Sequence, residues 1–244
     1  MSATAPFGTP RLHLRLTDST NTRARALAAA GAPHGTLVTA AEQSAGRGRQ
    51  GRTWSAPAGQ SLLSSVVVRD PPPLVSLLAG VAAAEAVGPE AQLKWPNDVY
   101  VARRKVAGIL VEGRPQEAWG IIGVGVNVAI APGAFPAELA DRAGTLGLGP
   151  DAIEPLLARL LEALERWLAA PAEKILGAVR ARDALLGQTV TWAGGTARGA
   201  GIDELGRLIV DTGGGRQALN AGEVHLRTDL ASGIRPKGGA TVDR

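Results

Sequence analysis

The sequence predicts an α+β fold, in which a large domain of mixed strands and helices precedes a small β-barrel-like domain. Strand and helix patterns are interspersed between residues 18 and 186. After Gly187, only short strands separated by glycine-rich turns follow. Hydrophobic residues make up 45% and charged residues 20% of the 244 residues, which is typical of a folded chain and not of a disordered one.

The large domain is predicted to begin with a helix. Ser19, Thr20 and Asn21 precede strong helix formers that end at Gly31, so the pattern predicts an N-capped helix whose start presents hydroxyls and free amides. Strands are predicted over residues 35–41 and 61–69, with a glycine-rich loop over residues 42–60 between them. An apolar run then predicts a buried helix over residues 74–87, with Pro73 at its first turn.

A short strand, a hairpin and two helices complete the large domain. The short strand covers residues 92–95, and Pro96 with Asn97-Asp98 ends it in a turn. Strands over 105–112 and 119–128 are predicted to pair as a hairpin, and helices over 152–168 and 172–186 to pack on the sheet. In the small domain, strands are predicted over residues 189–192, 197–202, 208–211 and 224–226.

Composition excludes several kinds of chemistry. The chain contains no cysteine, which excludes disulfides, thiolate zinc sites, iron–sulfur clusters and a cysteine nucleophile. Its three histidines, His13, His34 and His225, lie far apart and lack metal-ligand spacing, so no metal site is predicted. Neither a Walker A motif nor a nucleophile elbow is present in the sequence.

The charge balance and the apolar stretches bear on location and partners. The chain has 26 Lys plus Arg against 22 Asp plus Glu, a net charge of +4 that permits a polyanionic partner without requiring one. The N-terminus lacks the charged and apolar regions of a signal peptide, and the longest uncharged stretches are too short or interrupted to span a membrane. We expect a cytoplasmic protein without membrane contact.

The most informative segment is the loop Gly46-Arg47-Gly48-Arg49-Gln50-Gly51-Arg52-Thr53-Trp54. Glycines let backbone amides approach a ligand closely, and guanidinium groups make paired hydrogen bonds to phosphate or carboxylate. The loop therefore suits an anion; a solvated basic loop or an RNA-binding Gly/Arg tract is the alternative. Because many like charges lack an evident internal counter-charge, we expect residues 44–58 to be mobile without ligand.

Two further motifs contain candidate site residues. Lys94 lies between Leu93 and Trp95 on a short strand, where a bound anion would offset the cost of burying its ammonium; an ion pair with Asp98, or a lysine that extends to solvent at a strand edge, is the alternative. In the two longer strands, glycines such as Gly108 can admit a ligand or simply serve sheet packing. Asn127 needs hydrogen-bond partners among its apolar neighbours, and it can offer its amide to a ligand.

In this order and spacing, these motifs resemble those of the biotin protein ligases. The resemblance rests on Ser19–Asn21, Gln43, the Gly46–Trp54 loop, Lys94–Asp98, Lys105–Glu112 and Gly123–Asn127, and it extends to glycine-rich segments between residues 186 and 224. It implies a mixed, mostly antiparallel sheet packed with helices, as in class II synthetases, and a small SH3-like β-barrel. The implied domains are a catalytic biotin- and ATP-binding domain over 1–184, an SH3-like domain over 185–229 and a flexible tail over 230–244.

The resemblance also implies a two-step reaction. Biotin and ATP, with its Mg²⁺, would give biotinyl-5′-AMP and pyrophosphate, and a lysine of a biotin carboxyl carrier protein domain would then take the biotinyl group. Residue chemistry agrees, because a carboxylate and an α-phosphate repel each other unless cations lie between them. We expect a monomer or homodimer. Only 18 residues precede Ser19, too few for the DNA-binding domain of some relatives, so a ligase without operator binding is predicted.

By resemblance, each site residue has an expected role. Biotin would be bound by Ser19, Thr20, Asn21, Gln43, Arg47, Gly48, Arg49, Lys94 and Gly108. ATP and the adenylate would be bound by Arg47, Arg49, Arg52, Trp54, Lys94 and Asn127. Lys94 and Arg49 are the expected catalytic residues, and no residue is assigned to a metal. Gln50 departs from the family pattern, in which an arginine is common at this position.

Two other functions compete with this hypothesis. A lipoate-type ligase or acyltransferase would share the fold, although the absence of cysteine argues against acyltransferases that use a thioester. A nucleic-acid-binding module would use the arginine loop and the small barrel instead, and it would show strongly salt-dependent RNA binding without nucleotide exchange.

Overall fold

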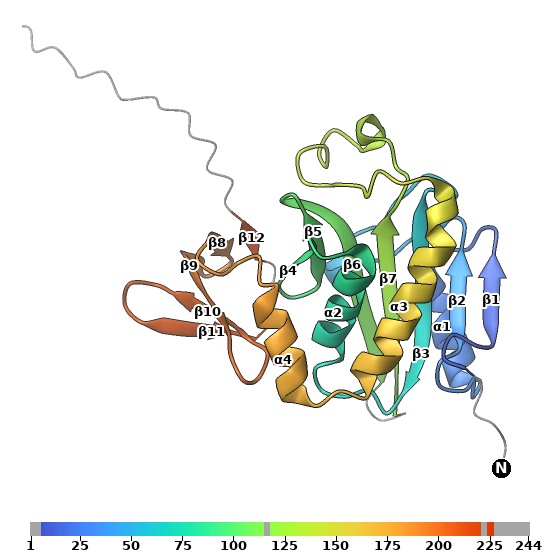
Figure 1. Cartoon of the computed structure of the whole chain (residues 1–244), viewed down its shortest axis with the longest axis horizontal. Coiled ribbons are helices and arrows are strands. Elements are labelled where there is room, and N and C mark those ends of the chain that lie inside the picture. Colours follow the sequence, from blue (N-terminus) through green and yellow to red (C-terminus); the bar gives the residue numbers. More distant parts are fainter. Residues whose placement is uncertain (1–5, 115–117, 221–223, 227–244) are drawn as a thin grey trace, which may run out of the picture.

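The computed structural model describes residues 6–114, 118–220 and 224–226 and contains two β-sheets (Figure 1). The large sheet has seven strands in the order β1-β2-β3-β7-β6-β5-β4, and every neighbouring pair is antiparallel except β1 and β2. It is therefore the mixed, mostly antiparallel sheet that was predicted. Its strands are β1 (Arg11–Leu14), β2 (Leu37–Ala40), β3 (Ser61–Arg69), β4 (Gln92–Lys94), β5 (Asp98–Val101), β6 (Arg104–Arg114) and β7 (Trp119–Asn127).

Helices cover both faces of this sheet. The first face packs against α2 (Val75–Val87) and α3 (Ile153–Leu168), which form the main core with alternate residues of β3 and β7 such as Val66 and Ile122. The second face packs against α1 (Thr20–Ala29), in a smaller core that includes Val67 and Ile121. Because side chains alternate across a strand, the residues of β7 that face α1 include Gly123, Gly125 and Asn127.

The small sheet lies at one end of the molecule, beside α4 (Ala172–Ala181) (Figure 1). Its five antiparallel strands follow the order β11-β10-β9-β8-β12 and have bounds β8 (Thr189–Trp192), β9 (Gly195–Ile202), β10 (Leu208–Asp211), β11 (Arg216–Leu219) and β12 (His225–Leu226). This antiparallel sheet corresponds to the predicted SH3-like domain; among the described residues its two outer strands, β11 and β12, do not pair with each other, so no closed barrel is seen there. The predicted tail over 230–244 lies outside the described residues, and the domain boundary at residue 184 stays a prediction.

Several predicted elements need correction. Strands β1, β5 and β11 were not predicted, and α4 ends at Ala181 instead of reaching residue 186. Ser19 occupies the N-cap position of α1 with extended backbone angles, but its side chain makes no capping hydrogen bond. The turn predicted at Asn97-Asp98 is followed at once by β5, which pairs with both β4 and β6.

The small sheet contacts the large domain behind the Lys94–Asp98 segment. The indole of Trp95 is buried and donates a hydrogen bond of 3.0 Å to the carbonyl of Gly206, in the turn between β9 and β10. The guanidinium of Arg180 on α4 donates to the carbonyl of Ile202 at 2.8 Å. These contacts attach the small sheet to α4 and to Trp95, the residue that follows Lys94.

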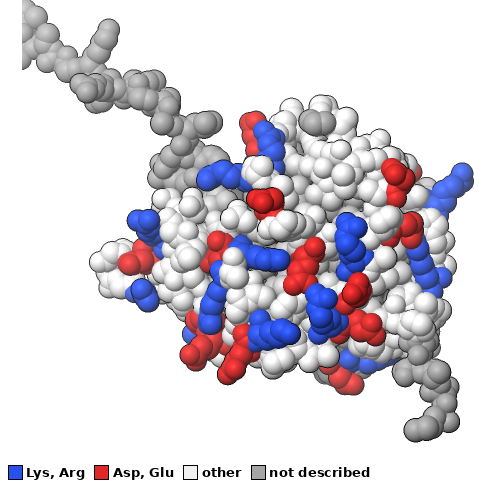
Figure 2. All heavy atoms as spheres, viewed as in Figure 1, with Lys and Arg blue, Asp and Glu red and all other residues white. Residues whose placement is uncertain are grey.

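Charged side chains of both signs are interspersed on the face that carries α2, α3 and α4, so the net positive charge is not gathered there in one basic patch (Figure 2). No helix within the described ranges is long and apolar enough to cross a membrane.

An ion pair between β1 and α3 gives the fold a pH-dependent contribution to stability. Arg11 donates two hydrogen bonds of 2.7 Å to the Glu154 carboxylate, and they hold the pKa of Glu154 below its ordinary value. A carboxylate with a lowered pKa stabilises the folded state above the ordinary glutamate range and loses this effect as pH falls through the lowered value. We expect Glu154→Gln to lower the melting temperature at pH 7 and to converge with the parent protein as pH falls through the lowered pKa of Glu154. Thermal unfolding across pH checks this, and a difference that does not change with pH would contradict it.

Candidate functional site

A cavity of about 440 Å³ opens on the α1 side of the large sheet, which is within the usual range for a small-molecule site. Its floor is built from glycines that face each other across strands, because Gly108 on β6 pairs with Gly125 on β7 and Leu110 pairs with Gly123. Small residues at these positions leave space above the sheet. All the residues predicted for the site line this cavity: Ser19, Thr20, Asn21, Gln43, Arg47, Gly48, Arg49, Arg52, Trp54, Lys94, Gly108 and Asn127.

One end of the cavity is a neutral polar network at the start of α1. The side-chain carbonyl of Gln43 accepts a hydrogen bond from the backbone amide of Thr20 at 2.7 Å and lies 3.1 Å from its hydroxyl. The hydroxyl of Ser65 on β3 lies 2.8 Å from the Thr20 hydroxyl and 2.6 Å from the side-chain oxygen of Asn21. Asn21 lies so close to the sheet that a Cβ on Gly123 would be 2.1 Å from its side-chain oxygen. This end can exchange hydrogen bonds with an uncharged polar group of a ligand.

The arginine loop is folded back on itself. The amide of Trp54 donates to the carbonyl of Gly46 at 2.9 Å, and the amide of Gly48 donates to the carbonyl of Arg52 at 2.7 Å. Gly46 has no room for a side chain, because a Cβ there would lie 2.2 Å from the carbonyl oxygen of Trp54. Gln50 and Gly51 form the tip, with φ angles of 56° and 75° in the left-handed region.

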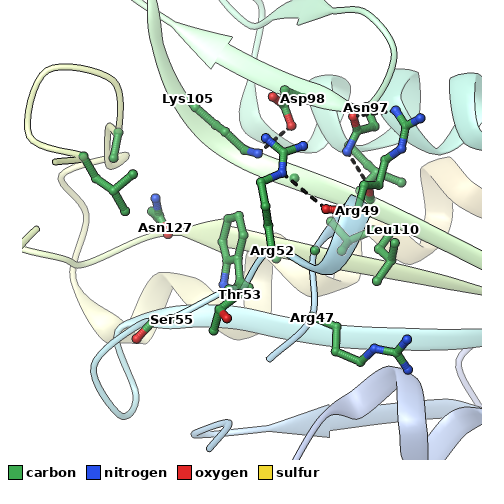
Figure 3. Close-up of a pocket in the computed structure, with 18 of the residues that line it drawn as sticks. Arg47, Arg49, Arg52, Thr53, Ser55, Asn97, Asp98, Lys105, Leu110 and Asn127 are labelled. Atoms are coloured by element: carbon green, nitrogen blue, oxygen red, sulfur yellow. Dashed lines mark hydrogen bonds and ion pairs between the residues drawn. The ribbon is translucent and has the colours of Figure 1, made fainter. Parts of the chain in front are cut away.

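The arginines of this loop have partners within the chain. Arg47 forms a 3.0 Å ion pair with Glu112, and Arg49 donates to the side-chain oxygen of Asn97 at 3.1 Å. The expectation that the loop lacks an internal counter-charge was therefore wrong, because Glu112 lies beside it. Whether residues 44–58 are mobile without ligand stays a prediction. Figure 3 shows Arg49 and Arg52 near Asn97 and Asp98, whereas Arg47 extends away from them.

The other end of the cavity contains two lysines that share one carboxylate. The ammonium of Lys105 is 2.6 Å from Asp98, and that of Lys94 is 3.7 Å from the other oxygen of the same group. The alternative interpretation of Lys94 as the partner of Asp98 is thus present in the structure. The side chain of Lys94 is 9% exposed and that of Lys105 is 28% exposed, so Lys105 is the ammonium more open to a ligand.

Aromatic side chains surround this charged end. The Trp54 ring covers the glycine floor, since a Cβ on Gly125 would lie 2.7 Å from it, and the Lys105 ammonium lies 5.7 Å from its centre. The hydroxyl of Tyr100 keeps its proton, because burial and the Asp98 carboxylate both raise the pKa of Tyr100. A positive group above an aromatic ring is stabilised by the ring's electrons.

Three lining residues with evident importance were not among the predicted site residues: Asn97, Asp98 and Lys105. The segments that contain them were noted, but the missed strand β5 hid their relation. Register between β5 and β6 pairs Tyr100 with Lys105 and Asp98 with Gly108, which brings the Lys105 ammonium to Asp98. The sequence signal for these three residues is Lys105, seven residues after Asp98, because a short hairpin between them returns the lysine to the carboxylate.

Asn127 has the hydrogen-bond partners that its buried amide was expected to need, and its role toward a nucleotide stays a prediction. Its buried side-chain amide donates to the backbone carbonyl of Gly144 at 2.9 Å. The backbone carbonyl of Asn127 accepts from the backbone amide of Leu146 at 2.9 Å. Asn127 therefore anchors the segment after β7 at the rim of the cavity. Within the described residues, no group of three or more His, Cys, Asp or Glu is placed to bind a metal ion.

Two protein-family models match this chain, and the first of them covers every residue that was predicted for the site. Residues 13–127 match the model of the biotin/lipoate A/B protein ligase family, and residues 178–227 match that of the biotin protein ligase C-terminal domain. The biotin–[acetyl-CoA-carboxylase] ligase of Mycobacterium tuberculosis is 37% identical, with 86% of this chain and 87% of that protein covered. The corresponding ligase of Paracoccus denitrificans is 38% identical, with 86% and 98% covered.

Other relatives extend the comparison. The bifunctional ligase/repressor BirA of Bacillus subtilis is 41% identical over 53% of this chain, but the match spans only 43% of that protein. Among solved structures, the biotin protein ligase from Aquifex aeolicus in complex with biotin and ATP superposes with a TM-score of 0.76 at 28% identity, covering 90% of this chain and 99% of that one. The fold, the cavity and the near full-length relatives agree: this chain belongs to the biotin protein ligase family.

Proposed function

We propose that this protein is an ATP-dependent ligase that attaches biotin to a lysine of a carrier protein domain through biotinyl-5′-AMP. The observation that carries the proposal is the polarity of the cavity, which has uncharged donors and acceptors around Asn21 at one end and cations around Asp98 at the other. A ligand with a neutral polar head and a carboxylate at the end of an aliphatic chain fits this arrangement. Biotin is such a molecule.

In the first step, a carboxylate oxygen of biotin bonds to the α-phosphorus of ATP, and pyrophosphate leaves. Both reactants are anions, so cations must offset their repulsion as charge develops between them. The ammonium groups of Lys94 and Lys105 and the guanidinium groups of Arg49 and Arg52 all line the charged end. We propose that these four cations together offset the repulsion between the biotin carboxylate and the α-phosphate, and that Mg²⁺ arrives bound to ATP.

In the second step, the amine of the acceptor lysine bonds to the acyl carbon of the adenylate, and AMP leaves. Until the acceptor arrives, water must be kept from the mixed anhydride. The loop between Gly46 and Trp54 borders the cavity and is suited to shield it. The carrier domain is the proposed partner; a cytoplasmic location, a monomeric or homodimeric state and the absence of operator binding stay predictions.

The proposed function is tested by incubating the protein with MgATP, a biotin carboxyl carrier domain and either biotin or lipoate. We expect a mass increase on one lysine of the carrier with biotin, and pyrophosphate exchange that depends on biotin. Exchange that occurs with lipoate but not with biotin would favour the lipoate-type ligase, because the matched family contains both biotin and lipoate ligases. Salt-dependent RNA binding without exchange in either mixture would favour the nucleic-acid module.

Replacing Arg49 tests the role of the arginine loop. We expect Arg49→Ala to slow biotin-dependent pyrophosphate exchange by at least about tenfold, since a guanidinium that interacts with the developing charge is removed. Arg198→Ala, on the exposed part of the small sheet, is the matched control that also removes one arginine. An exchange rate for Arg49→Ala within about twofold of the parent protein would contradict this role.

A further inference from the structure

The Glu112 carboxylate, near the end of β6, is shared by three side chains from two other parts of the chain. One of its oxygens accepts a hydrogen bond of 2.5 Å from the guanidinium of Arg25 and forms a 3.0 Å ion pair with the guanidinium of Arg47. The other accepts from the side-chain amide of Asn21 at 2.9 Å. The Glu112 side chain is 17% exposed and does not line the cavity, whereas Asn21 and Arg47 do.

The bond from Asn21 fixes how the polar end of the cavity is oriented. With its amide nitrogen donating to Glu112, the amide oxygen of Asn21 points to Ser65, which lies 2.6 Å away. Ser65 donates its one proton to Asn21, so it can only accept from the Thr20 hydroxyl, which lies 2.8 Å away. This directs the Thr20 proton to Ser65 instead of Gln43, and the Gln43 oxygen keeps the backbone amide of Thr20 as its donor. A single negative charge outside the cavity therefore sets the direction of a chain of hydrogen bonds that lines it.

The bond from Arg47 fixes one side of the arginine loop. Arg47 pairs with Thr53 across the loop, and the loop closes between Gly46 and Trp54. Because Asn21 is on α1 and Arg47 is on the loop, Glu112 joins two segments that contact different parts of a ligand. A carboxylate that accepts from charged donors forms stronger hydrogen bonds than a neutral acceptor does.

We propose that Glu112 is a positioning residue for biotin binding, which acts by holding Asn21 and Arg47 in one arrangement. This inference rests on the proposed function. Glu112 itself does not touch the ligand; the side chains that it holds do. Removing its charge releases Arg47 and the loop and weakens the hydrogen bond from Asn21, while the charged end around Asp98 keeps its own contacts.

Steady-state kinetics of the full chain test the proposal. In Glu112→Gln, the side chain keeps its size and can still accept from Asn21, but it loses the charge that holds Arg47. We expect the KM for biotin in pyrophosphate exchange to rise about tenfold, with the KM for ATP within about twofold of the parent value. Glu154→Gln is the matched control, because it removes the carboxylate of another arginine ion pair, far from the cavity.

Arg25 separates positioning from a purely structural role. The Arg25 side chain bonds to Glu112 but does not line the cavity. If Glu112 served only the stability of α1 through Arg25, then Arg25→Gln would raise the KM for biotin as much as Glu112→Gln does, and this result would overturn the proposal. We expect Arg25→Gln to change that KM by less than about threefold, because Arg47 and Asn21 keep their bonds to Glu112.

Hydrogen exchange of the ligand-free protein gives a second readout that does not depend on catalysis. We expect the amides of Gly48 and Trp54, which are bonded within the loop, to exchange at least about fivefold faster in Glu112→Gln than in the parent protein. Unchanged exchange in the loop, or a KM for biotin within about twofold of the parent, would overturn the proposal. A parent protein that forms no adenylate from biotin would overturn the proposed function instead, while loop exchange would still show whether Glu112 holds the loop.

Discussion

Lys105→Met is expected to reduce biotin-dependent pyrophosphate exchange by at least about 100-fold, because the variant removes the most accessible ammonium of the cavity and keeps most of the aliphatic stem. Lys94 is the matched comparison, since it pairs with the same Asp98 but is 9% exposed against 28% for Lys105. A buried ammonium at 3.7 Å from Asp98 serves to neutralise that carboxylate, and we expect Lys94→Met to slow exchange by about tenfold. The two rates, measured at saturating biotin and ATP, check the ranking.

As a control for this comparison, the stability of each variant is measured, so that a loss of activity is not caused by unfolding. Asp98 is buried and would keep only one of these two lysines in either variant, so both are expected to lose stability by about 1–3 kcal/mol, the cost of removing one partner of a buried polar group. Thermal unfolding measures this loss, and the assays are run below both melting temperatures. If Lys94→Met slows exchange more than Lys105→Met does, then Lys94 is the cation that bridges the reactants, as the sequence alone suggested.

The elements that could be predicted from the sequence share a clear physical signal. The strand β3 matches its predicted range: residues 61–68 form an unbroken buried run, and Pro71 follows soon after the strand ends at Arg69. By contrast, β1 is a short edge strand with mostly exposed side chains, so it lacks the alternation that marks a half-buried strand. The strand β5 begins at Asp98, inside the Asn97-Asp98 turn signal, and four residues are too few to show a strand pattern of their own beside it.

For the site, residue types were easier to predict than their mutual contacts. Residue chemistry identified Arg47 and Lys94, the resemblance to the biotin protein ligases identified Asn21, and all three line the cavity. That Glu112 would pair with Arg47 could not be read from the chain, because the pair is formed by strand register between β6 and β7 and by the fold of the loop. Tertiary pairing of charges depends on register, and one residue of slip would place Glu112 on the opposite face of the sheet.

Gly123→Ala is expected to abolish biotin binding through a steric effect on Asn21. We expect no saturable binding at biotin concentrations up to about 100 times the KM of the parent protein. The added Cβ would lie 2.1 Å from the side-chain oxygen of Asn21 and 2.9 Å from its Cγ, so Asn21 has to leave its position. Its hydrogen bonds to Ser65 and Glu112 are then lost. Gly120→Ala, on the same strand, is the control, because a Cβ there would first meet Pro71 at 3.3 Å.

The double variant Asn21→Ala/Gly123→Ala separates the steric cause from the polar one. Without the Asn21 side chain, the methyl group on residue 123 has room, so we expect the double variant to be more stable in thermal unfolding than Gly123→Ala alone. Biotin binding should not return, because the Asn21 amide is displaced in the single variant and absent in the double variant. Normal biotin affinity in Gly123→Ala, measured by calorimetry, would mean that Asn21 does not bind the vitamin. The neutral polar end of the cavity would then need a different ligand group.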